Sequence, residues 1–153
     1  MRMRPFLATI QLLAAFIPAM LSWPGQAQTQ DIILFADESL KTAIEEANSL
    51  FLYENAMKVI VTYGKSPELA RQIEGGAKTD VFISSAPQAM DGLIQRKLID
   101  PSTRADLVRK PPATYPIAIT TESTNVLASI YLQYMTSPKA APFFEKQGFT
   151  FLP

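Results

Sequence analysis

The stretch from Asp31 to Leu52, DIILFADESLKTAIEEANSLFL, combines the two patterns that decide the fold. Residues 31–36 form a short apolar run of the kind found in strands buried on both faces of a parallel sheet. From Leu40 onwards the apolar residues recur at helical spacing, at positions 40, 43, 44, 47, 50 and 51. Ser39 stands directly before this pattern, where we expect it to act as the N-cap. The stretch therefore predicts a strand followed by a helix.

The same alternation continues along the chain. Residues 58–63 are rich in β-branched side chains and predict a second strand, which a helix over residues 67–74 follows, with Ser66 as its N-cap. A third strand is expected over residues 80–84 and a third helix over residues 87–97. Strands that alternate with helices in this way are typical of a parallel sheet covered by helices.

The pattern changes in the second half of the chain. Residues 100–112 predict at most one helical turn, after which Pro111 and Pro112 impose an extended path. Residues 115–119 form a fourth candidate strand in the same sheet. Two helices are expected over residues 125–135 and 138–147. The predicted fold class is α/β, a three-layer sandwich with a mostly parallel sheet.

The N-terminal segment has the order of a secretory signal. Two arginines precede an apolar run over residues 5–23, and the small residues Gly25 and Ala27 follow at the positions that a signal peptidase reads. An N-terminal membrane anchor is the alternative, because the run is nearly long enough to span a bilayer. Prolines and the small residues after the run favour cleavage. We expect a signal peptide over residues 1–27, cleaved near Ala27, and an exported single domain over residues 28–153.

Composition excludes several kinds of chemistry. The 153 residues include no histidine and no cysteine, so the chain cannot supply a Ser-His-Asp or Cys-His nucleophile pair, a zinc finger, haem or iron–sulfur ligands, or a disulfide. The 14 Lys and Arg residues balance 14 Asp and Glu residues without a basic run, which argues against a nucleic-acid partner. Catalysis by carboxylate or lysine, and binding without catalysis, remain.

Two serines occupy equivalent places in the predicted fold. Ser39 and Ser66 each stand where a strand passes into a helix, at the sheet edge where open α/β folds bind ligands. A helix N-terminus offers unpaired N–H groups and a serine adds a hydroxyl donor, so the two together could form a receptor for an anion. The alternative is that both serines only cap their helices, for about 1 kcal/mol each.

Five segments of the chain carry a resemblance to a known family: FADESL (35–40), YGKSPELARQIEGGA (63–77), DVFIS (80–84), YPIA (115–118) and FFEKQGF (143–149). In this order they resemble the periplasmic molybdate-binding proteins of molybdate ABC transporters. The resemblance implies one lobe of a type II periplasmic binding protein fold and a tetrahedral oxyanion held by neutral donors. Carried over by motif, the ligand-binding residues are Ser39, Ser66 and Tyr115.

The same resemblance implies a function and a location. The ligand would be molybdate or a related oxyanion such as tungstate, with no cofactor and no metal bound directly, since molybdenum enters only as the oxyanion. The partner would be the membrane permease of an ABC importer, and the protein would be periplasmic. No motif pairs two carboxylates for acid–base catalysis, so an enzyme acting through Asp37 or Glu38 is not expected.

The chain departs from the family at the residues before Ser39. The family usually has small apolar residues there, whereas this chain has Asp37 and Glu38. A carboxylate facing a dianion would repel it by about 1 to 4 kcal/mol at a separation of about 4 Å, an effect that Lys65 could partly offset. Alternatively both acids point to solvent and stabilise the helix through its dipole, by about 0.3 to 1 kcal/mol each. We prefer this second interpretation for Glu38.

A second departure concerns the middle of the chain. Between Arg109 and Pro111 the family would run out into a second lobe and back, so the chain is similar to a member whose segments 28–109 and 111–153 are joined directly. The resemblance then implies half a binding cleft, weak binding and an exposed cleft face that could favour self-association. A folded remnant or interaction module without a ligand is the alternative function.

Overall fold

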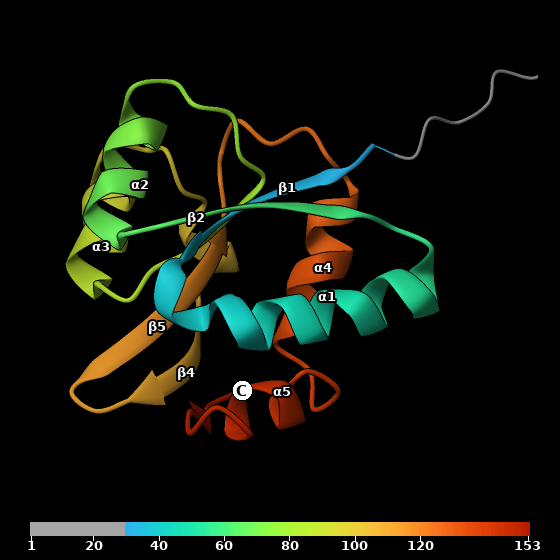
Figure 1. Cartoon of the computed structure of the whole chain (residues 1–153). Coiled ribbons are helices and arrows are strands. Elements are labelled where there is room, and N and C mark those ends of the chain that lie inside the picture. Colours follow the sequence, from blue (N-terminus) through green and yellow to red (C-terminus); the bar gives the residue numbers. More distant parts are fainter. Residues whose placement is uncertain (1–29) are drawn as a thin grey trace, which may run out of the picture.

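The computed structural model describes residues 30–153 as a six-stranded sheet with helices packed on both of its faces (Figure 1). The strands are β1 (Ile32–Asp37), β2 (Val59–Gly64), β3 (Val81–Ile83), β4 (Ala105–Lys110), β5 (Ala113–Ile119) and β6 (Thr150–Phe151). The helices are α1 (Lys41–Asn55), α2 (Ser66–Glu74), α3 (Pro87–Gln95), α4 (Leu127–Met135) and α5 (Ala141–Glu145). Two 3-10 turns are η1 (Glu38–Leu40) and η2 (Pro101–Thr103). The order of strands across the sheet is β2-β1-β3-β5-β4-β6. This arrangement confirms the α/β fold class.

The sheet is mixed. Strand β1 lies between β2 and β3 and pairs with both in parallel, as predicted, with Leu34 opposite Val61 on one side and Val81 on the other. The predicted fourth strand, β5, joins the same sheet but runs antiparallel to β3 and β4, and β6 runs antiparallel to β4. Parallel pairing between neighbours is therefore limited to β1, β2 and β3. Strand β5 follows β4 through a short turn, runs antiparallel to it and lies between β3 and β4 in the sheet.

Strands β4 and β5 form a hairpin in the part of the chain where the helical pattern ends. The expected helical turn is η2, and the chain is already extended in β4 before it reaches Pro111 and Pro112. These two prolines lie in the turn between the strands, where the missing N–H groups interrupt no ladder. The extended path thus follows from pairing with β5 and β6, and not from the prolines alone.

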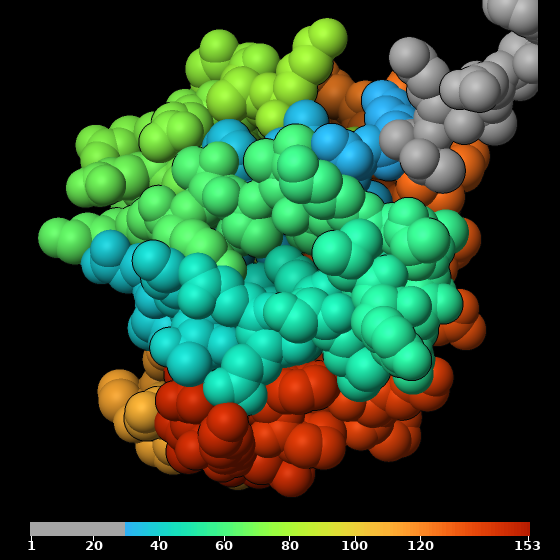
Figure 2. Space-filling model, turned by 45° about the vertical axis from the view of Figure 1, so that its right-hand side comes forward, coloured from blue at the N-terminus to red at the C-terminus, as the bar shows by residue number. Residues whose placement is uncertain are grey.

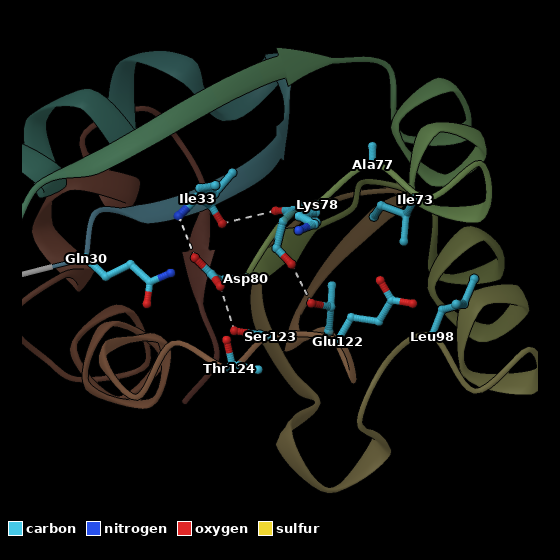
Figure 3. Close-up of a pocket in the computed structure, with 12 residues that line it drawn as sticks. Gln30, Ile33, Ile73, Ala77, Lys78, Asp80, Leu98, Glu122, Ser123 and Thr124 are labelled. Atoms are coloured by element: carbon cyan, nitrogen blue, oxygen red, sulfur yellow. Dashed lines mark hydrogen bonds between the residues drawn. The ribbon is translucent and has the colours of Figure 1, made fainter.

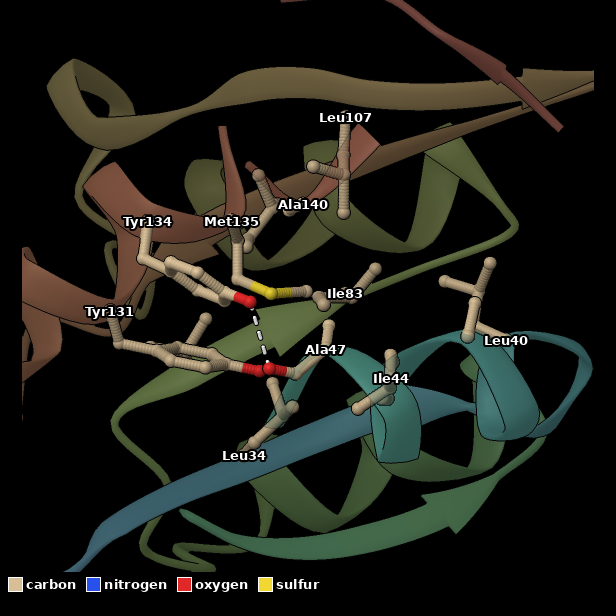
Figure 4. Packing of buried hydrophobic residues seen from close by; sticks show 14 of the residues in the cluster. Leu34, Leu40, Ile44, Ala47, Ile83, Leu107, Tyr131, Tyr134, Met135 and Ala140 are labelled. Atoms are coloured by element: carbon tan, nitrogen blue, oxygen red, sulfur yellow. Dashed lines mark hydrogen bonds between the residues drawn. The ribbon is translucent and has the colours of Figure 1, made fainter. Parts of the chain in front are cut away.

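The core has two layers, one on each face of the sheet. Helices α1, α4 and α5 cover the larger layer, in which Tyr131 is fully buried (Figure 4). Phe51 is fully buried in the same layer. The Tyr134 hydroxyl donates a hydrogen bond of 2.8 Å to the Ala47 carbonyl and so connects α4 to α1. Helices α2 and α3 cover the smaller layer, around Phe82 and Met90. Two apolar layers hold the ends of β1, β2 and β3 in place for the site described below.

The C-terminal part of the chain packs alongside α1, and the two form adjoining parts of one face (Figure 2). Lys146 Nζ lies 3.0 Å from a Glu46 carboxylate oxygen, and Lys139 Nζ lies 2.8 Å from Glu54. Both pairs are largely exposed, so we assign them at most about 1 kcal/mol each. Apolar packing of Phe144, which is fully buried, is the main attachment of this segment.

The predicted signal peptide over residues 1–27 lies outside the described residues. Within residues 30–153, none of the helices has both the length and the apolar character needed to cross a bilayer.

Candidate functional site

Three strand ends meet at one edge of the sheet. Strand β1 ends at Asp37, β2 is followed by Lys65 and Ser66, and β3 is followed by Ser84 and Ser85. The three strands are parallel neighbours, so their carboxyl ends place these residues together at the edge where α/β folds bind ligands.

The carboxylate of Asp37 lies at the centre of this cluster. Its Oδ1 accepts hydrogen bonds from the Ser39 backbone N–H at 3.1 Å and from the Ser39 hydroxyl at 2.6 Å. Its Oδ2 accepts from the Ser66 N–H at 3.2 Å and from the Ser66 and Ser85 hydroxyls at 2.6 Å each. Only 6% of Asp37 is exposed. Five neutral donors from three segments of the chain therefore surround one negatively charged group.

The structure brings the three predicted site residues together at this edge, with Ser39 and Ser66 bonded to the carboxylate and Tyr115 beside Ser39. Ser66 is fully buried beneath it, and Ser39 reaches it from the exposed side. The Tyr115 hydroxyl oxygen lies 3.2 Å from Ser39 Oγ, and its ring packs edge-on against Phe149 with centroids 5.4 Å apart. The role of these residues in binding a ligand stays a prediction.

The predicted capping roles of the two serines are wrong. Asp37 is the N-cap of η1, where its side chain accepts from the Ser39 N–H, and α1 begins only at Lys41. Helix α2 starts at Ser66 itself, with Lys65 as the N-cap residue and no side-chain cap. The physical reason is that a cap side chain accepts from a backbone N–H of the first turn. The Asp37 side chain already accepts from the Ser39 N–H, and the Ser66 hydroxyl oxygen accepts instead from the Ser85 N–H.

Sequence reasoning missed Ser85 and the position of the Asp37 side chain. Ser85 follows a predicted strand and stands shortly before Pro87 and α3, the same order that singled out Ser66, so a signal was present. Its backbone N–H also donates to Ser66 Oγ at 2.7 Å. Glu38 is exposed, as the preferred interpretation expected, whereas Asp37 points into the site and not to solvent.

Hydrogen bonds control the ionisation of Asp37. Burial acts to raise the pKa of this carboxyl, but the hydroxyls of Ser39, Ser66 and Ser85 and the Ser39 N–H together hold it below its ordinary value. None of the ion pairs within residues 30–153 involves Asp37. Over the same residues, no group of three or more acidic side chains gathers to hold a metal ion. The negative charge is thus stabilised by neutral donors.

The lowered pKa of Asp37 predicts acid sensitivity. Its contribution to the free energy of unfolding is fully present above the ordinary pKa of 3.8 and is lost as the pH falls below that value, because the unfolded chain then binds a proton more readily. We expect the Asp37→Asn variant to lack this part of the pH dependence. Denaturant unfolding between about pH 2.5 and 6 measures it, with Glu38→Gln as the control. Equal slopes in the wild type and Asp37→Asn would contradict this assignment.

A separate cavity lies at the opposite end of the parallel strands, near their amino ends (Figure 3). It has a volume of about 250 Å³, and Asp80 lies in its wall. The Asp80 carboxylate accepts from the Ile33 N–H at 2.8 Å, the Ser123 hydroxyl at 2.6 Å and the Asn125 side-chain amide at 3.2 Å. These bonds tie β1, β3 and the segment before α4 together, so the role of Asp80 is structural.

The comparisons with known proteins identify the family. The model of the family described as bacterial extracellular solute-binding protein matches residues 32–114, and the chain belongs to this family. A relative, the molybdate-binding protein ModA of Escherichia coli (strain K12), is 39% identical over 77 residues. The matching segment makes up 50% of this chain and 30% of that relative, so it covers less than a third of the relative's length. The resemblance to the molybdate-binding proteins is confirmed.

Solved structures show the same fold. A substrate-binding domain assigned to a molybdenum ABC transporter from Clostridium difficile superposes with a TM-score of 0.74 at 17% identity, over 80% of this chain and 99% of that one. The periplasmic molybdate-binding protein of Azotobacter vinelandii gives a TM-score of 0.73 at 12% identity, over 80% of this chain and 100% of that one. At these identities the match describes the fold of the chain and not its ligand.

Proposed function

We propose that this chain is the oxyanion-binding lobe of an extracytoplasmic solute-binding protein of an ABC importer. Its ligand is molybdate or a similar tetrahedral oxyanion such as tungstate. The observation that carries the proposal is the cluster of neutral donors at the strand ends, which already surrounds one oxyanion, the carboxylate of Asp37. The relatives named as molybdate-binding proteins support the choice of ligand.

Neutral donors suit this kind of ligand for a physical reason. Hydroxyl and backbone N–H groups compensate a spread negative charge through fixed dipoles, and the N-terminus of α2 adds its positive dipole end at Ser66. The donors come from Ser39, Ser66 and Ser85, with the Tyr115 hydroxyl beside them. No cofactor takes part in this mode of binding.

The family supports the rest of the proposal. A binding protein of an importer delivers its solute to a membrane permease, so we place this chain in the periplasm, exported by the segment over residues 1–27, with no nucleic acid among its partners. A folded module without a ligand is the second candidate, and one observation favours it. The Asp37 carboxylate accepts from the same donors that an oxyanion would need.

Titration with sodium molybdate up to millimolar concentration tests the proposal. In the Asp37→Ala background, where no carboxylate competes for the hydroxyl, we expect Ser66→Ala to weaken binding by at least about tenfold, because a hydrogen bond to a charged group contributes about 1.5 to 3 kcal/mol. Ser49→Ala is the matched control, since that serine is exposed on α1 and donates only to the Glu45 carbonyl. Calorimetry measures the affinities.

The outcome separates the two candidate functions. Equal affinity with and without Ser66→Ala in the Asp37→Ala background would place the binding site elsewhere. A flat titration of a folded wild-type chain and of its variants at the Asp37 position would select the module without a ligand.

A further inference from the structure

We propose that Asp37 is an internal ligand whose carboxylate occupies the oxyanion site, so that a free oxyanion binds only when this side chain leaves. The inference rests on the proposed function and deepens it. It starts from the side chain at the end of β1, which turns into the cluster of donors and is 6% exposed. The end of the strand does not force an acidic side chain into this position, because the neighbouring Glu38 is exposed to solvent.

The five donors around Asp37 all form hydrogen bonds to its carboxylate. Oδ1 of Asp37 takes two donors and Oδ2 takes three, at distances between 2.6 and 3.2 Å. Each of the three serine hydroxyls has a single hydrogen, which these contacts occupy. A second anion would therefore find none of these five donors free and would face a carboxylate at close range. A cation is equally unsuited, because the lone pairs of the carboxylate already accept these bonds.

The carboxylate is also a tethered competitor. The backbone of Asp37 is fixed by parallel pairing opposite Gly64, so the side chain stays within reach of the site at a high effective concentration. It can leave by rotating toward the exposed side, where Glu38 and Ser39 lie. The apparent affinity of an external oxyanion is then reduced in proportion to the fraction of time that the site is vacant.

Removal of the side chain tests the inference. We expect Asp37→Ala to bind molybdate at least about a hundredfold more tightly than the wild type, and Asp37→Asn, which keeps the shape without the charge, to show a smaller gain. Glu38→Ala is the matched control, because it removes the same charge one residue along the chain from an exposed position, and it should stay within about threefold of the wild type. The double variant Asp37→Ala/Ser66→Ala should lose the gain.

Thermal unfolding with formate separates this inference from the proposed function. Asp37→Ala leaves donors without an acceptor, so we expect it to be less stable than the wild type and to be stabilised by formate, the same group without its tether. Stabilisation by both formate and molybdate supports the internal ligand and the molybdate function. Stabilisation by formate alone supports the internal ligand and overturns molybdate as the solute.

Two results would overturn the internal ligand. One is the absence of stabilisation of folded Asp37→Ala and Asp37→Asn by either anion. The other is a wild type that binds molybdate as tightly as both variants, in which case the solute-binding function stands and Asp37 is only a structural residue.

Discussion

The wild-type chain is expected to bind molybdate at least a thousandfold more weakly than an intact two-lobed relative in the same buffer. A thousandfold difference corresponds to about 4 kcal/mol. The loss of two or three opposing hydrogen bonds to the anion, at about 1.5 to 3 kcal/mol each, is sufficient for this difference. An anion held from one side also stays hydrated on the other, where high dielectric weakens the remaining bonds. Calorimetry on both proteins gives the comparison.

A contrary result would be informative about assembly. A ligand at about a hundred times its dissociation constant stabilises a protein by about 2.7 kcal/mol, which a thermal shift detects easily. A clear shift at micromolar molybdate that disappears in Ser39→Ala would show that one lobe suffices or that two copies build a cleft between them. Sedimentation with and without molybdate distinguishes these two cases, and a dimer that forms with ligand would bear out self-association through the cleft face.

The β4–β5 hairpin explains why the weaker binding is expected. By resemblance, the family's chain passes from this region into its second lobe, whereas here β4 ends at Lys110 and β5 begins at Ala113. The two strands pair directly, with Lys110 opposite Ala113, so the turn between them is closed. Tyr115, the third predicted ligand, is thereby held in the sheet, with 6% of its surface exposed. On the proposed function, an oxyanion at Ser39, Ser66 and Tyr115 would therefore lack the opposing donors of a second lobe.

Local patterns were enough to predict the first half of the fold. The apolar runs that became β1, β2 and β3 alternate with helical spacing, and short crossovers then leave parallel pairing as the regular solution. Strand β4 escaped prediction because its pairing depends on partners later in the chain, β5 and β6. Helix α5 covers Ala141–Glu145 and is shorter than the predicted range of 138–147. The residues on either side of it form turns, with hydrogen bonds between residues three apart.

The candidate site was predictable in position but not in chemistry. Ser39 and Ser66 could be placed at one edge because a strand end is visible in the sequence, and the resemblance added Tyr115. The direction in which Asp37 points could not be read in the same way. That direction depends on Ser85 and Ser66, whose hydroxyls donate to the carboxylate and stabilise its buried charge. Both serines come from other strand ends, so they approach Asp37 only when the sheet has formed.

The stability of the lobe depends most on the layer between the sheet and α1. Phe51 is fully buried there, with its ring 5.2 Å from that of Tyr131 in an edge-on contact and 5.0 Å from that of Tyr134. Both tyrosines also use their hydroxyls, Tyr131 by donating to Asn48 at 2.8 Å and Tyr134 by donating to Ala47. Phe51 is therefore the apolar contact around which α1 and α4 are joined.

Phe51→Ala is expected to lower the free energy of unfolding by about 3 to 5 kcal/mol, because it removes the apolar burial of a large ring and leaves a cavity that the two tyrosines, held by their hydrogen bonds, cannot fill. The melting temperature should fall by about 10 °C or more. Tyr53→Ala is the matched control, since that aromatic residue of the same helix is 88% exposed. It should change the stability by no more than about 0.5 kcal/mol. Denaturant unfolding of both variants measures the difference, and similar losses in the two would mean that α1 packs on the sheet through another face.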